Sequence, residues 1–108
     1  MRTTKYTVKL GYPRDDLHAL FATASEADVD DGGHYDARGA AINIWTHGWH
    51  HQGTREESET TGTLYFQWGN ETCYLREIEC DEGFEKDDLL RELGILEEKA
   101  LGRRVHGS

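Results

Sequence analysis

The sequence lacks any apolar run long enough for a signal peptide or a membrane-spanning helix. Residues 1–10 alternate polar and apolar side chains, and no stretch approaches the roughly 20 apolar residues that a span requires. We therefore expect a soluble, cytoplasmic protein. Cysteine is scarce as well, because Cys73 and Cys80 are the only two. Their odd separation would place them on opposite faces of one strand, which argues against a mutual disulfide.

The chain also lacks the motifs that identify common enzymes. It contains no phosphate-binding glycine loop, no dinucleotide-binding glycine pattern and no GxSxG motif around a nucleophilic serine. Acidic residues lie close to both cysteines in the sequence, and such neighbours raise the pKa of a thiol. We therefore predict that the protein is not an enzyme and that it needs no cofactor.

Basic residues are few relative to acidic ones: 12 Lys and Arg stand against 21 Asp and Glu, which gives a net charge of -9. Such a surface repels the phosphates of nucleic acids and of anionic membranes, so we expect direct binding to neither. It would instead attract a partner with a basic surface. A charge that only keeps the protein soluble, or that adapts it to high salt, is the alternative explanation.

The length of 108 residues suffices for one domain with a single core. Three Trp, five Tyr and three Phe argue against disorder, because disordered chains are poor in aromatic residues. We expect one domain over residues 1–106. Residues 107–108 are then either a native tail or an added extension.

The first part of the chain predicts a strand followed by a helix. Polar residues alternate with apolar ones over residues 3–12, as in a half-buried strand. Pro13 suits the first turn of a helix, where Asp15 and Asp16 would interact favourably with the helix dipole. Apolar residues then recur at helical spacing between Leu17 and Ala24.

The remainder predicts three strands and a second helix. The strands cover residues 40–46, 63–68 and 72–80, although the alternation in the last of these is mixed. Residues 53–62 read as an exposed loop, and residues 69–70 as a two-residue hairpin turn. The helix begins near Phe84 and ends at a predicted stop over residues 93–95.

The resulting order, β-α-β-β-β-α, predicts an α+β fold, with an antiparallel sheet and helices packed on one face. The predicted core consists of the residues on the apolar face of each element: Leu17, Leu20, Phe21, Ile42, Ile44, Leu64, Phe66, Leu89 and Leu93.

The acidic residues gather in three segments rather than spreading evenly. On the second helix, Glu85, Asp88 and Glu92 share one face, where like charges weaken a helix slightly. A solvated surface would explain the clusters, but they also suit docking on a basic protein. The predicted partner-binding residues are Asp28, Asp30, Asp31, Glu56, Glu57, Glu59, Asp81, Glu82, Glu85, Asp87, Asp88 and Glu92.

These features together favour a small, non-enzymatic binding protein that docks on a basic, nucleic-acid-binding protein and inhibits it. Anti-defence proteins of phages and mobile elements, such as inhibitors of CRISPR complexes, share this size and acidity. Immunity proteins against nuclease toxins do so as well. The analogy rests on size and charge alone, and the sequence leaves open whether the chain forms a homodimer.

The Trp/His-rich segment 45–51 supports an alternative function, a small metal- or ligand-binding domain. His47, His50 and His51 lie close enough in the sequence to converge on zinc, copper or nickel. In a straight strand, however, His50 and His51 face opposite ways, and no HExxH or CxxC motif completes the site. The acidic segment from Asp28 lacks the glutamate that closes a calcium-binding loop. We therefore predict no bound metal.

Overall fold

The structure, a computed structural model, describes residues 3–26, 33–46 and 59–106. Among these residues, no helix is long and apolar enough to cross a membrane. The described segments form seven elements, in the order β1 (Thr3–Pro13), α1 (Arg14–Glu26), β2 (Gly33–Arg38), β3 (Ala41–Thr46), β4 (Glu59–Gln67), β5 (Thr72–Asp81) and α2 (Lys86–Leu101).

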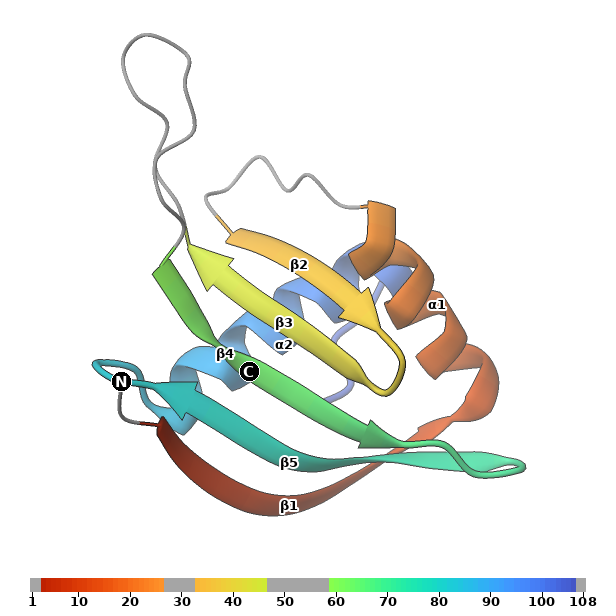
Figure 1. The fold of residues 1–108 in the computed structure, drawn as a ribbon. Coiled ribbons are helices and arrows are strands. Elements are labelled where there is room, and N and C mark those ends of the chain that lie inside the picture. The colour runs from red at the N-terminus through yellow and green to blue at the C-terminus, as the bar shows by residue number, and fades with distance from the viewer. Residues whose placement is uncertain (1–2, 27–32, 47–58, 107–108) are drawn as a thin grey trace, which may run out of the picture.

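The strands form one antiparallel sheet in the order β1-β5-β4-β3-β2. From β2 to β5 each strand pairs with the next, and β1 pairs with the remaining edge of β5. α1 therefore connects the two edges of the sheet, and both helices lie on the same face (Figure 1). We call the other side of the sheet the open face. The predicted α+β fold, with an antiparallel sheet and helices on one face, is confirmed.

β2 is a strand that the sequence analysis did not predict, so the order is β-α-β-β-β-β-α. Tyr35 is the only buried residue among its described side chains. Asp36 forms an ion pair with Arg38, at 2.8 Å between Oδ2 and Nε. Gly39 then adopts a φ of 58°, which glycine tolerates, in the tight turn to β3. So short and polar an edge strand has too few apolar residues to show a clear alternation.

α2 runs without interruption to Leu101, so the predicted stop at residues 93–95 is wrong. Gly94 is buried inside the helix, between the buried residues Leu93 and Leu96. Burying a leucine contributes about 1.5–3 kcal/mol, whereas glycine in a helix interior costs about 1 kcal/mol relative to alanine. Packing therefore outweighs propensity, and the helix ends at Gly102, a left-handed C-cap with a φ of 76°.

β4 begins at Glu59, so residues 59–62 belong to a strand rather than to the predicted loop. Residues 53–58 lie outside the described part of the chain. Gly62 is buried, and a Cβ atom there would collide with the Glu79 carbonyl of β5 and with the Leu89 side chain of α2. The glycine thus lets the helix pack closely on the sheet. The connection from β4 to β5 has four residues, 68–71, rather than the predicted two.

An extra residue interrupts the pairing of β5 with β4. Tyr65 of β4 pairs with Glu77, but its neighbour Phe66 pairs with Leu75, so Arg76 has no partner across the ladder. Such a β-bulge shifts the alternation of a strand by one residue. Side chains that face the core can therefore occupy odd-numbered positions before Arg76 and even-numbered positions after it.

The bulge corrects one prediction about the cysteines. Cys73 and Cys80 were expected on opposite faces of the strand, but both are buried in the core because Arg76 shifts the alternation between them. Both thiols are free in the structure.

The core follows the predicted apolar faces closely. Phe21 is the exception, because it is only half-buried; its ring packs against Phe66 and Trp68, with centroids 5.4 and 5.2 Å away. The other predicted core residues are buried: Leu17, Leu20, Ile42, Ile44, Leu64, Phe66, Leu89 and Leu93.

We expect Phe66→Ala to lower the free energy of unfolding by about 3–5 kcal/mol, because the ring is fully buried and its removal leaves a cavity. Phe21→Ala should cost clearly less, since part of its ring already contacts solvent. Urea unfolding of both variants beside the wild type measures the two losses. Equal losses would contradict the different burial of the two rings.

Candidate functional site

Several residues of the predicted sites lie outside the described part of the chain. This group comprises Asp28, Asp30, Asp31, Glu56 and Glu57 of the acidic clusters, and His47, His50 and His51 of the alternative metal site. Glu59 begins β4, but its side chain is not among those described. Within the described residues, no group of three or more His, Cys, Asp or Glu side chains could hold a metal ion.

Four of the six remaining predicted residues lie where β5 leads into α2. Glu82, Glu85 and Asp87 are exposed there, and Asp88 is half-buried beside them. We call these four residues the acidic tip. Two of them also shape the helix: the Glu85 backbone N–H donates to Asp88 at 2.8 Å, and the Glu85 side chain accepts from the Asp88 N–H in return. These two carboxylates thus form a capping box at the first turn of the helix, in addition to the like-charge spacing noted in the sequence.

Asp81 and Glu92 occupy different surroundings from the tip. Asp81 is only 9% exposed, and its Oδ2 atom makes no hydrogen bond with any described residue. Burial, and then the charge of Glu79, raise the pKa of this carboxyl group. Glu92 is half-buried and accepts a hydrogen bond of 2.7 Å from the Tyr35 hydroxyl of β2. Neither carboxylate is as available to a partner as Glu82 or Asp87.

The electrostatic effect of these acids converges on Cys80. Burial raises the pKa of its thiol most, and the charges of Asp88, Asp81 and Glu85 raise it further, in that order. Of the acidic residues next to Cys80 in the sequence, only Asp81 is among these charges; Asp88 and Glu85 follow later in the chain. Carboxylates from β5, the turn and α2 thus all act on this one buried thiol.

A second buried carboxylate, Glu97, fastens the end of the chain to the sheet. It accepts a hydrogen bond of 2.6 Å from the Tyr12 hydroxyl of β1 and bonds from the backbone N–H groups of Val105 and His106. The His106 ring donates from Nε2 to the Gly11 carbonyl at 2.7 Å. These contacts satisfy the oxygen atoms of a fully buried carboxyl group, and burial together with the Glu97 contact raises the Tyr12 pKa.

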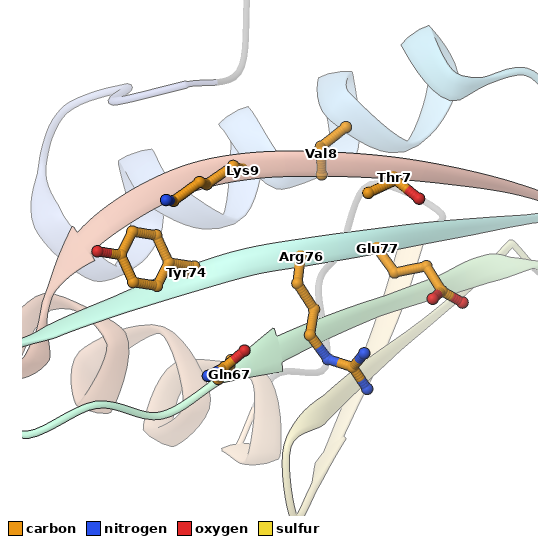
Figure 2. A pocket seen from close by; sticks show the side chains of 7 residues that line it. All are labelled: Thr7, Val8, Lys9, Gln67, Tyr74, Arg76 and Glu77. Atoms are coloured by element: carbon orange, nitrogen blue, oxygen red, sulfur yellow. The ribbon is translucent and has the colours of Figure 1, made fainter.

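The open face carries a hollow of about 500 Å³. Figure 2 shows it from the side away from the helices, with Lys9 reaching toward the Tyr74 ring and Arg76 extending across β4. The Lys9 Nζ atom lies 5.1 Å from the centre of that ring, within cation–π range. We call this site the open-face hollow; its lining residues are Thr7, Val8, Lys9, Gln67, Tyr74, Arg76 and Glu77.

Sequence analysis did not identify the hollow, although the sequence contains a sign of it. Apolar core residues of β5 occur at Cys73 and Leu75 and then at Ile78 and Cys80, so the alternation changes parity. A change of parity inside a strand indicates a bulge, and bulges often redirect side chains beside functional sites. The mixed alternation noted for residues 72–80 was this signal.

Three comparisons with known proteins found no match to this chain. No protein-family model, curated protein or solved structure matches the chain.

Asp81→Asn should raise the melting temperature at pH 7. The raised pKa means that the fold favours the protonated carboxyl, so Asp81 opposes folding increasingly as the pH rises through its folded-state pKa. An amide of the same shape carries no charge and removes this cost. At pH 3, where both side chains are neutral, the two proteins should melt at similar temperatures. Thermal melts at both pH values test this, and a variant that melts below the wild type at pH 7 would refute it.

Proposed function

We propose that this chain is a small, non-enzymatic binding protein that docks its acidic tip on a basic surface of a nucleic-acid-binding protein. The observation that carries the proposal is the exposure of Glu82, Glu85 and Asp87 beside the half-buried Asp88, where β5 leads into α2. Charges concentrated in this way produce a field that extends into solvent and steers a positively charged partner.

The arrangement of the tip supports the proposal. Glu82 and Asp87 are exposed and form no ion pair with any other described residue, so binding would not first have to break an internal contact. Glu85 and Asp88 are held by their reciprocal hydrogen bonds, which lowers the conformational entropy lost on docking. A partly preorganised row of carboxylates can take the place of nucleic-acid phosphates on a basic surface.

Docking on a basic surface of the partner would inhibit that partner. Basic grooves in proteins commonly hold nucleic acid, so a protein docked there would compete with it. The proposal thus describes a cytoplasmic inhibitor of the kind that phages and mobile elements use against defence complexes, or an immunity protein against a nuclease toxin. We propose no direct contact with nucleic acid and no reaction.

The experiment compares Glu82→Lys with Glu71→Lys. Both are exposed glutamates that change the net charge equally, but Glu71 precedes β5 and Glu82 follows it, so they lie at opposite ends of the strand. Partners are captured from the native host with the wild type, identified by mass spectrometry and purified, and association rates are then measured. Asp88 is unsuitable for this test because its replacement would also remove the helix cap.

Glu82→Lys should slow association at low salt, whereas Glu71→Lys should leave it near the wild-type rate. The difference should shrink as salt is raised, because the Debye length falls from about 10 Å at 0.1 M to about 3 Å at 1 M. Nucleic acid should compete with the wild type for the partner. Equal rates for the two variants, or binding unaffected by nucleic acid, would contradict the proposal.

A further inference from the structure

Two cations at the open-face hollow have no acidic partner among the described residues. Neither Lys9 nor Arg76 forms an ion pair there, although the chain has nearly twice as many acidic as basic residues. Five other basic residues each lie within 4.0 Å of a carboxylate: Lys5, Arg38, Arg91, Arg103 and Arg104. The charges of Lys9 and Arg76 therefore remain available for an outside anion.

Two irregularities of the sheet bring these cations to the same site. On one side of β5, Arg76 bulges against β4. On the other side, Thr7 pairs with Glu77 and Leu10 with Leu75, so Val8 and Lys9 together oppose the single residue Arg76. Bulges on both sides of one strand at the same level locally disrupt the ladder and redirect the side chains there. The hollow lies at this level.

The remaining walls suit a polar ligand. Gln67 contributes an amide and Thr7 a hydroxyl, both on exposed residues. Glu77 is the one acidic side chain in the lining, but it pairs with Lys5 at 3.7 Å and points away from Tyr74 in Figure 2. Its negative charge is thus partly neutralised and directed away from Lys9, which the Tyr74 ring holds in place.

We propose that the open-face hollow binds a small organic anion, a carboxylate or a phosphate monoester, with Arg76 on one side of the ligand and Lys9 on the other. A guanidinium group presents paired N–H donors that match the oxygens of either group. The volume of about 500 Å³ lies within the range of small-molecule sites. This binding is additional to the docking proposed for the acidic tip and does not depend on it.

The test is a titration followed by the amide resonances of the ¹⁵N-labelled protein. Succinate supplies carboxylates and glycerol 3-phosphate supplies a phosphate monoester, each at constant ionic strength, with chloride as the reference anion. We expect saturable shifts at the hollow, in Lys9, Gln67, Tyr74 and Arg76, with one or both ligands. The stronger of the two responses identifies which oxyanion the site prefers.

Arg76→Gln should weaken binding about 10- to 100-fold, as expected for the loss of a charge-assisted hydrogen bond. Lys99→Gln is the matched control: it removes one positive charge from an exposed side chain of α2 and should leave the affinity unchanged. Since Arg76 is exposed, its variant should retain the dispersed spectrum of a folded protein.

Three results would overturn the proposal. One is the absence of saturable shifts with both ligands, each at about 10 mM, a concentration well above the Kd of a millimolar site. Another is equal weakening by Arg76→Gln and Lys99→Gln, which would indicate a general charge effect. The third is a response to an acidic peptide alone, because the hollow would then recognise a protein segment rather than a small molecule.

Discussion

The extra residue in β5 is the constraint on which the rest of the sheet depends. Leu75 and Ile78 are separated by three positions, an odd number, and yet both are fully buried on the side of the helices. In a regular strand, a side chain three residues further along faces the opposite way, so Ile78 and Cys80 would turn to the open face. The bulge at Arg76 removes this conflict. Both halves of β5 thereby contribute to one core.

The same bulge helps to separate charges of opposite sign along the molecule. Arg76 itself projects from the middle of β5 on the open face and lines the same hollow as Lys9, whereas Glu82 and Asp87 lie beyond the end of the strand. A chain of net charge -9 therefore offers a local pair of cations as well as an acidic tip. The two proposals therefore assign different partners to two regions of opposite charge.

The sequence was informative where one periodicity held over a whole element. Leu17 and Leu20 on α1, and Leu64 and Phe66 on β4, could be assigned to the core from spacing alone. Sequence analysis failed where tertiary contacts determine the local structure. Gly94 continues a helix because its neighbours are buried, and β2 is too short and polar to show an alternation. Lys9 and Arg76 line the same hollow because of the register between β1 and β5. The alternation within either strand does not reveal that register.

The bulge can be tested directly from the register of β4 against β5. Cross-strand nuclear Overhauser effects between backbone protons report which residues lie opposite one another. The structure predicts contacts that pair Tyr65 with Glu77 and Phe66 with Leu75, with Arg76 left unopposed. A regular ladder would instead keep the first pair and place Phe66 opposite Arg76. Observation of that second pattern would contradict both the shared core of β5 and the geometry of the hollow.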